Sequence, residues 1–294
     1  MSEEPQYHVD GELVPAREAT VSVRDRGFMY GDAAFETIRA YGGELFAWKS
    51  HADRLSETCS ILELDHGLTD SDLRDRIKET LAANGFDEAY VRLSVTRGVQ
   101  PGTLEPGPEV DPTVVVIVRE LPRGGIFGEP IWDGPARVQT VKTTKIPDAS
   151  VPARAKTHNY LNGILARLEL RGSDADEALV LDTDGYVAEG TVSNVFFVTG
   201  NALCTPSTAG PILPGITREV VIELARSEGI PVETGRYRPD DVRSADEVFL
   251  TGSTREVQPV DRVDGIRIGG DDRPVTQLLS RLYDERVERT MYDG

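Results

Sequence analysis

Short β-type segments that turn at glycine-containing pairs recur along the chain and alternate with stretches of helical periodicity. Asp10-Gly11, Gly42-Gly43 and Asp184-Gly185 each lie between runs rich in apolar and β-branched residues, which is the pattern of a β-hairpin. Apolar residues at helical spacing occur over residues 55–62, 73–81, 158–170 and 216–227, and again from residue 275. The two periods together predict the α+β class.

Length and one irregular segment predict two domains. A chain of 294 residues is long enough for two cores of ordinary size. Residues 121–130 are rich in Gly and Pro and lack periodicity, as interdomain linkers do. We therefore expect a smaller N-terminal domain over residues 1–120, a linker over 121–130 and a larger C-terminal domain over 131–294.

The run TVVVIV at residues 113–118 predicts a strand in the first domain. Its residues are continuously apolar or β-branched instead of alternating with polar ones. Such a run is typical of a strand that is covered on both faces.

Acidic residues strongly outnumber basic ones. Asp and Glu total 50 against 32 Lys and Arg, for a net charge of −18, and no basic stripe is present to bind nucleic acid. No apolar run reaches the roughly 20 residues of a membrane-spanning helix, and the start MSEEPQYHVD is unlike a secretion signal. We expect a cytoplasmic protein without nucleic-acid or membrane partners, suited to the salt-rich cytoplasm of a halophile.

Several common catalytic signatures are absent from the sequence. It contains no GxxxxGK[ST], GxGxxG, HExxH or GxSxG motif. Its two cysteines, Cys59 and Cys204, are far apart, and its four histidines do not fall at metal-ligand spacing. We therefore expect neither a metal site nor a disulfide framework.

Lysine chemistry remains, and Lys156 has the surroundings that suit it. It lies in VPARAKTHNYLNGILARL, just before a helix with an apolar face formed by Leu161, Ile164, Leu165 and Leu168. A partly shielded lysine at a helix start can attack a carbonyl carbon. Position alone still favours an ordinary surface lysine. We expect no catalytic role for the other four: Lys78 on a solvated helix face, Lys142 and Lys145 at a polar strand end, and Lys49 in a loop.

Three further segments add an acid and two phosphate-binding turns. DGYVAEGTVSN places the carboxylate of Glu189 at a strand end. LPGITR, at residues 213–218, turns directly into a helix whose first N–H groups, at Ile216 and Thr217, suit a phosphate. TGSTR, at residues 251–255, ends a strand with small hydroxyl residues. Helix capping explains LPGITR equally well on its own, but with Lys156 the segments form a consistent set.

In this order, over nearly the whole chain, the motifs resemble those of the fold type IV pyridoxal-phosphate enzymes, the class IV aminotransferase family. That family includes branched-chain aminotransferases, D-amino-acid aminotransferases and 4-amino-4-deoxychorismate lyases. The resemblance implies a smaller N-terminal α/β domain and a larger C-terminal domain with a barrel-like β core. It also implies pyridoxal 5′-phosphate as the cofactor and a homodimer.

The resemblance gives each cofactor residue a role. Lys156 is similar to the lysine that carries the cofactor as an imine, and Tyr160 to the tyrosine that bonds its phenolic oxygen. Glu189 resembles the glutamate that keeps the pyridine nitrogen protonated, so that the ring can accept electrons. The phosphate would be bound by Arg54, Ile216, Thr217 and Ser253. At the position of Ser253 many relatives have threonine, which also carries a hydroxyl group. The ring face would lie against Leu213.

The substrate side resembles two branches of the family. Tyr30 is placed like the pocket tyrosine of branched-chain enzymes, although those read FEGIR where this chain reads FETIR. Arg92 aligns with a pocket arginine of the branched-chain enzymes, and Arg97 with the carboxylate-binding arginine of D-amino-acid aminotransferases. The two arginines are an odd number of residues apart on one expected strand, so their side chains should point to opposite faces. Only one of them should therefore hold a substrate carboxylate, and the sequence does not say which. Further substrate contacts are implied for Phe35, Arg39, Tyr90 and Thr254.

Two reactions are consistent with these motifs. Lys156 would move a proton between the substrate Cα and the cofactor C4′, and transamination between an amino acid and a 2-oxo acid would follow. Tyr30 and the pair Tyr90 and Arg92, which aligns with the pocket tyrosine and arginine of the branched-chain enzymes, favour this reaction with a branched-chain or other apolar substrate. SNVFFV and GSTREVQPV resemble the lyase branch, which releases pyruvate and 4-aminobenzoate from aminodeoxychorismate. A non-catalytic cofactor-binding protein would be expected to lack Lys156, Glu189 or Arg54.

Salt should stabilise this protein. Ions screen the repulsion among its excess acidic groups, and that repulsion opposes the compact state. We expect a higher Tm in molar KCl than in dilute buffer, measured by circular dichroism. KCl is preferred to sulfate because sulfate strengthens apolar burial in any protein. Equal Tm values in the two KCl concentrations would contradict the expectation.

Overall fold

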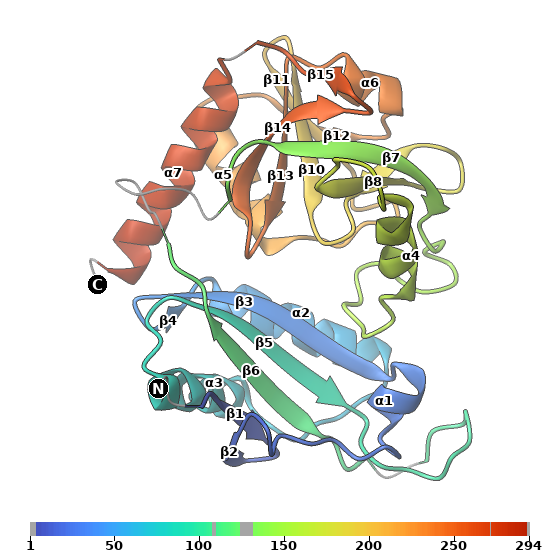
Figure 1. Cartoon of the computed structure of the whole chain (residues 1–294), viewed down its shortest axis with the longest axis vertical. Helices are drawn as coiled ribbons and strands as arrows, with labels where there is room; N and C mark the ends of the chain where they lie inside the picture. The colour runs from blue at the N-terminus through green and yellow to red at the C-terminus, as the bar shows by residue number, and fades with distance from the viewer. Residues whose placement is uncertain (1–3, 108–109, 124–131, 271, 293–294) are drawn as a thin grey trace. The chain divides into compact units, whose positions relative to one another are not determined.

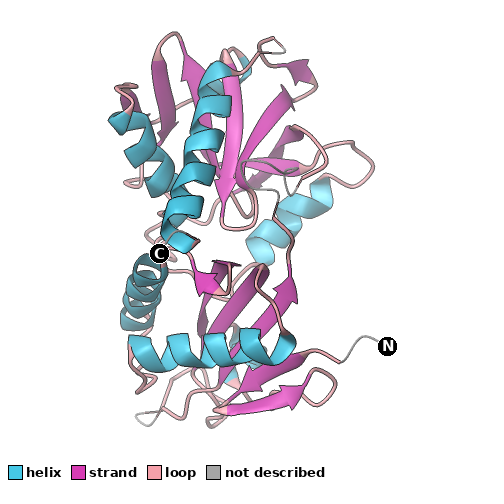
Figure 2. Cartoon of the chain, turned by 90° about the vertical axis from the view of Figure 1, so that its left-hand side faces the viewer, coloured by secondary structure: helices cyan, strands magenta, loops and turns pink. Residues whose placement is uncertain are grey.

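The computed structural model describes residues 4–107, 110–123, 132–270 and 272–292 (Figure 1). The chain forms two compact units. Unit 1 comprises Met1–Arg123, Ala155–Asn159 and Met291–Gly294, and unit 2 comprises Gly124–Arg154 and Tyr160–Thr290. Most of the expected linker, residues 124–130, lies outside the described residues. Each unit combines a β-sheet with helices, so the α+β class is confirmed (Figure 2).

Unit 1 contains a six-stranded antiparallel sheet. Its strand order is β2 (Glu12–Pro15), β1 (Gln6–Val9), β6 (Val114–Glu120), β5 (Ala89–Thr96), β3 (Ala33–Tyr41) and β4 (Glu44–Leu45). Its helices are α1 (Arg26–Tyr30), α2 (Trp48–Ile61) and α3 (Asp70–Asn84). Helix α2 packs on β3, and α3 packs on β1 and β6, so that helices and strands share one apolar core.

The hairpin turns expected in unit 1 are confirmed. Asp10 and Gly11 join β1 to β2 with φ angles of 47° and 100°, and Gly42 and Gly43 join β3 to β4 with φ angles of 57° and 75°. A two-residue turn with positive φ at both positions matches the twist of the strands it connects, and glycine adopts that backbone without strain.

Strand β6 departs from the expectation that both of its faces are covered. Val114, Val116 and Val118 are buried, whereas Val115 and Ile117 are only half-buried. The expectation was wrong because β-branched residues favour a strand on either kind of face, so a continuous run indicates conformation more reliably than burial.

Unit 2 is built on a nine-stranded mixed sheet. Its order is β12 (Val232–Gly235), β11 (Ala202–Pro206), β10 (Asn194–Thr199), β13 (Glu247–Gly252), β14 (Glu256–Val263), β7 (Ala136–Thr144), β8 (Glu177–Leu181) and β9 (Val187–Glu189), with β15 (Ile266–Arg267) paired to β14. Pairs β11–β12, β14–β7 and β7–β8 are parallel. The antiparallel β8–β9 hairpin contains the expected Asp184-Gly185 turn.

Four helices accompany the sheet in the described part of unit 2. They are α4 (Leu161–Glu169), α5 (Ile216–Ser227), α6 (Pro239–Arg243) and α7 (Pro274–Met291). Among the described residues, no helix has both the length and the hydropathy of a bilayer-spanning segment.

Helix α4 begins at Leu161, later than the expected start near His158. The residues before it are extended: Thr157 forms a bridge with Ala34, and the N–H of His158 donates to the C=O of Ala33 at 3.0 Å. Because this backbone is already paired with β3, it cannot also form the first turn of the helix.

The apolar face of α4 is turned outward. Leu161, Ile164, Leu165 and Leu168 are 65%, 54%, 46% and 39% exposed, and the buried residue of the helix is Ala166. Apolar residues at helical spacing therefore mark an exposed stripe here, in contrast to α2, where Leu55 and Cys59 lie in the core.

Candidate active site

Lys156 is held in unit 1 by two backbone hydrogen bonds. Its C=O accepts from the N–H of Phe35 at 3.0 Å, and its N–H donates to Oγ1 of Thr58, on α2, at 3.1 Å. Its Nζ lies 4.4 Å from the centre of the Phe35 ring. The amine is thus positioned by β3 and α2, which are far from it in sequence.

Arg54, on α2, forms a buried ion pair with Glu36 of β3. Its Nε and Nη2 donate to Oε1 and Oε2 of Glu36 at 2.8 and 2.7 Å, and Nδ1 of His51 lies 2.8 Å from the same carboxylate. Burial opposes ionisation of Glu36, but the charge and hydrogen bonds of Arg54, with the hydrogen bond of His51, outweigh it and lower the pKa of Glu36 to about 2. The ionised carboxylate therefore fixes the direction of the guanidinium.

Glu36 is a site residue that the sequence did not single out. Strand β3 is buried or half-buried along its whole length, so alternation does not show which side chain serves a site. The usable signal is an acid within the apolar run AAFETIRAY, followed by His51 and Arg54 three residues apart on one helix face.

Arg92 and Arg97 lie in different surroundings. The guanidinium carbon of Arg92 is 3.9 Å from the centre of the Phe35 ring. Arg97 is buried, donates to both carboxylate oxygens of Asp32 at 2.8 and 3.1 Å, and also donates to two backbone carbonyls just beyond α2. Arg92 is on β5, whereas Arg97 follows the last residue of that strand, Thr96, and the two side chains contact different elements.

His158 also contacts Phe35. Its ring meets the Phe35 ring edge to face at 5.5 Å, and its Nε2 lies 3.2 Å from Oγ of Ser94. Burial, with a smaller effect of the Arg92 charge, lowers the pKa of His158 to about 4. The imidazole is therefore neutral near pH 7 and adds no charge beside Lys156.

The other substrate candidates of unit 1 have partners of their own. The guanidinium of Arg26 lies 5.1 Å from the Tyr30 ring centre, and that of Arg119 lies 4.4 Å from the Tyr90 ring centre. Arg39 is buried and donates to Glu88 at 3.4 Å and to the carbonyl of Pro122 at 3.2 Å. Four residues along β3, roughly 13 Å at about 3.3 Å per residue, separate Arg39 from Phe35.

Glu189, at the end of β9 in unit 2, is a buried acid with three donors. Nζ of Lys145 lies 2.7 Å from its Oε1, and the Asn194 amide and the Leu213 N–H both donate to its Oε2 at 3.1 Å. Burial disfavours the charged form of Lys145. The negative charge of Glu189 and its hydrogen bond to Lys145 outweigh this effect, so the pKa of Lys145 is raised.

Lys145, expected at a polar strand end, is partly shielded from solvent in the structure. Its side chain is 23% exposed and ion-paired. Its N–H donates to the C=O of Leu181, which extends the pairing of β7 with β8 and carries the lysine toward Glu189. This contact joins residues 44 positions apart, which explains why the sequence around Lys145 gives no sign of it.

Helix α5 begins at Ile216, as expected, with Gly215 at its N-cap. A Cβ at Gly215 would lie only 1.9 Å from Oδ1 of Asn194, so this close approach requires glycine. Asn194 also donates to the C=O of Leu213 at 3.0 Å and thereby ties the turn to Glu189. The first N–H groups of a helix have no acceptor within it and suit an anion, as the sequence predicts for Ile216 and Thr217.

The TGSTR turn is anchored by a second buried acid, Glu177. Ser253 and Thr254 are half-buried just after β13, and Nη2 of Arg255 lies 3.2 Å from Oε2 of Glu177. Oε1 of Glu177 accepts from the N–H of Thr191 at 3.1 Å. Glu177 therefore links this turn to the turn that follows Glu189.

The predicted residues are divided between the two units. Unit 2 holds Tyr160, at the N-cap of α4, with Glu189, Leu213, Ile216, Thr217, Ser253 and Thr254; unit 1 holds Lys156, Arg54, Tyr30, Phe35, Arg39, Tyr90, Arg92 and Arg97. Lys156 and Tyr160 are four positions apart in sequence yet belong to different units.

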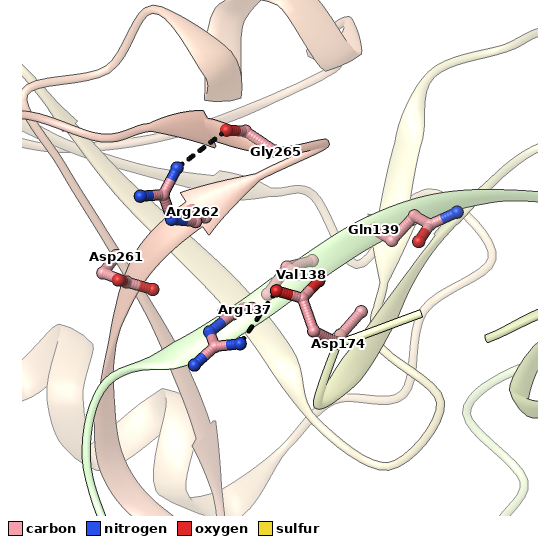
Figure 3. Close-up of a pocket in the computed structure, with 8 residues that line it drawn as sticks. Arg137, Val138, Gln139, Asp174, Asp261, Arg262 and Gly265 are labelled. Carbon is pink, nitrogen blue, oxygen red and sulfur yellow. Dashed lines mark hydrogen bonds and ion pairs between the residues drawn. The ribbon is translucent and has the colours of Figure 1, made fainter. Parts of the chain in front are cut away.

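None of the predicted residues lines the polar pocket of unit 2 shown in Figure 3, a hollow of about 450 Å³. Arg137 pairs there with Asp174 at 2.8 Å, and Arg262 donates to the carbonyl of Gly265. In the described part of the chain, no group of three or more His, Cys, Asp and Glu side chains could hold a metal ion.

Comparison with known proteins gives a consistent result. Residues 33–263 match the family model for class IV amino-transferases. A Methanocaldococcus jannaschii protein, provisionally named a branched-chain-amino-acid aminotransferase, is 41% identical over 280 residues, which cover 95% of this chain and 94% of that protein. The aminodeoxychorismate lyase of Bacillus subtilis is 30% identical over 288 residues, which cover 97% of this chain and 96% of the lyase.

A solved structure is also similar over nearly the whole chain. The branched-chain amino acid aminotransferase from Thermobaculum terrenum, in its PLP-bound holo form, has a TM-score of 0.86 and 28% sequence identity. The match covers 98% of this chain and 95% of that structure, so both units are included.

Replacing Glu36 should destabilise the protein, because the buried guanidinium of Arg54 would lose its negatively charged partner. We expect Glu36→Gln to lower the free energy of unfolding by about 3 kcal/mol at pH 7, measured by urea denaturation. Asp53→Asn, which removes the partner of exposed Lys49 on the same helix, is the matched control and should change it little.

The sign of the pH dependence follows from the lowered pKa of Glu36. Its stabilising effect is complete above its ordinary pKa of 4.5 and is lost as the pH falls through about 2. The gap between wild type and Glu36→Gln should therefore narrow from pH 4.5 toward pH 2. A loss no larger than that of Asp53→Asn would contradict the role given to Glu36.

Proposed function

The chain belongs to the class IV aminotransferases, and on that basis we propose that it is a pyridoxal-phosphate transaminase acting on branched-chain or other apolar amino acids and 2-oxo acids. The observation that carries this choice is Arg92, the arginine of the branched-chain resemblance, which lies against the same Phe35 ring as Lys156. We place its action in the cytoplasm, without nucleic-acid or membrane partners.

The residues present fit the cofactor. Gly215 leaves a cradle at the start of α5 where N–H groups suit a phosphate, and Glu36 holds the guanidinium of Arg54 in a fixed direction. Pyridoxal phosphate, when bound, supplies an electron sink for bond breaking at the substrate Cα. The phosphate would be held by Arg54, Ile216, Thr217 and Ser253, the ring nitrogen by Glu189, the phenolic oxygen by Tyr160 and the ring face by Leu213.

Lys156 would hold the cofactor through its amine. As a base, its Nζ would accept the proton of the substrate Cα and deliver it at C4′ of the cofactor. The backbone bonds to Phe35 and Thr58 limit the movement of the lysine, which favours transfer between two nearby atoms.

We propose Arg92 as the residue that binds the substrate carboxylate. Arg97 donates hydrogen bonds to Asp32 and to two backbone carbonyls, so binding a substrate carboxylate would require breaking buried interactions. The guanidinium carbon of Arg92 lies 3.9 Å from the centre of the Phe35 ring, the same ring that Nζ of Lys156 approaches to 4.4 Å. Tyr30, Phe35, Tyr90 and Thr254 remain proposed pocket residues.

Aminodeoxychorismate lyase is the alternative function. The Bacillus subtilis lyase spans nearly the whole chain, and the lyase reaction would use the same lysine as a base. In that reaction pyruvate leaves by β-elimination, so no 2-oxo acid acceptor is needed.

A half-reaction experiment separates the two functions. With L-leucine, the cofactor-loaded enzyme should lose the absorbance of its lysine-bound cofactor and form an equimolar amount of 2-oxo acid. Lys156→Ala should slow this by at least about 100-fold because the base is lost, whereas Lys142→Ala, on the exposed side of β7, should not. Undiminished turnover in Lys156→Ala would overturn the assignment. Pyruvate release from aminodeoxychorismate without an acceptor would support the lyase.

We further propose that the enzyme is a homodimer, supported by the exposed apolar stripe of α4. Wild-type protein should sediment as a dimer, and Leu161→Glu combined with Leu165→Glu should give monomers if the stripe is the interface. Ile266→Glu, at a comparably exposed residue on β15, is the control and should remain dimeric. An unchanged dimer in the double variant would show that the stripe is not the interface.

A further inference from the structure

We propose that Lys145 is a positioning residue that shares the Glu189 carboxylate with the ring nitrogen of the cofactor and so weakens the hold of Glu189 on the proton of that nitrogen. The inference rests on the proposed function, because Glu189 faces the ring only if pyridoxal phosphate binds. Neither the motifs nor the family resemblance assigns Lys145 a role.

The hydrogen bonds of Glu189 leave room for one further donor. A carboxylate offers about four acceptor positions. Within the described residues, Glu189 uses three of them: Oε1 receives Lys145, and Oε2 receives Asn194 and the Leu213 N–H. The amide and the backbone donor fix the plane of the carboxylate, while Lys145 supplies the positive charge.

Lys145 is well placed to remain charged. Its side chain is largely shielded, and its pairing with Glu189 at 2.7 Å favours the ammonium form over the neutral amine. Tyr160 lies close enough to affect its charge state as well. Lys145 therefore acts as a resident cation beside the position at which the ring nitrogen is expected.

Other charged groups near Glu189 are engaged elsewhere. The charge of Glu189 acts on the pKa of Arg218, on α5, but the guanidinium of Arg218 donates to Glu219 and to the carbonyl of Pro206. The neighbouring acid Glu177 is paired with Arg255. Among the described residues, Lys145 is thus the basic side chain that pairs directly with the Glu189 carboxylate.

Two cations that share one carboxylate weaken each other's binding. Lys145 neutralises part of the charge that would attract a protonated ring nitrogen, and it repels that nitrogen at short range in a shielded site. Loss of the lysine charge should therefore strengthen the interaction of Glu189 with the N–H of the ring. A lysine with a purely structural role would affect every ring equally, whether or not the ring carries that N–H.

The test compares two ligands on cofactor-free protein. One is pyridoxal phosphate, and the other is its analogue with C–H in place of the ring nitrogen. The readout is the ratio of the Kd of the analogue to the Kd of pyridoxal phosphate, measured by titration of the bound-cofactor absorbance. Lys145→Met should raise this ratio about tenfold over wild type, the equivalent of about 1.4 kcal/mol.

Matched variants isolate the charge. Lys145→Arg keeps the cation and should leave the ratio near that of wild type, whereas Lys145→Gln keeps a donor without charge and should raise it. Lys142→Met, at the exposed lysine of the same strand, should have no effect. In a Glu189→Gln background, Lys145→Met should no longer change the ratio. If Lys145→Met does not fold, Lys145→Gln takes its place in the comparison.

Each outcome decides the proposal. An unchanged ratio, with both ligands weakened alike, would overturn it and leave Lys145 as a structural residue. A lower ratio would also overturn it, because Lys145 would then assist the ring nitrogen. If wild-type protein binds neither ligand, the proposed function itself fails. Binding of both ligands with an unchanged ratio refutes only the role of Lys145.

Discussion

Backbone pairing between β3 and the segment around Lys156 is the constraint on which the lysine site depends. Strand β4 pairs only with the far end of β3, at Ala40 and Tyr41. The edge near Ala33 and Phe35 would otherwise present backbone groups without partners, and residues 156–158 satisfy them. The amine proposed to hold the cofactor is thus located by main-chain hydrogen bonds between β3 and a short segment that is distant from it in sequence. This also explains why helix α4 cannot begin before Leu161.

The acids of the site differ from those that give the chain its net charge. Most of the 50 acidic residues can be solvated at little cost, but Glu36, Glu177 and Glu189 are buried, and each contacts a basic side chain. Burying an unpaired charge costs several kcal/mol, so removal of either partner of such an ion pair destabilises the protein. Each acid and its basic partner therefore fix each other's position. Glu36 and Glu177 orient the guanidinium groups of Arg54 and Arg255, which belong to the segments proposed to bind the phosphate, whereas Glu189 is proposed to face the ring.

Local signals in the sequence predicted much of the fold. The hairpin turns follow from positive φ at glycine-containing pairs, and the start of α5 follows from the Pro-Gly turn before Ile216. The family resemblance read from the lysine, glutamate and LPGITR motifs is confirmed by the match over residues 33–263. Glu36 and Lys145 were missed because their roles arise only when Arg54 and Glu189 reach them from other elements. The half-burial of β6 was missed because one strand does not reveal what covers it.

The basic character of the Phe35 neighbourhood can be understood against the acidic chain. Arg92 and Lys156 both lie against the Phe35 ring, and Arg54 lies on the helix that also bonds to Lys156. His51 and His158 add no charge near neutral pH, because burial lowers the pKa of each. Glu36 therefore offsets only part of the local positive charge. In a molecule of net charge −18, such a neighbourhood attracts anions that the rest of the surface repels, and the two anions that transamination must gather are a phosphate and a carboxylate.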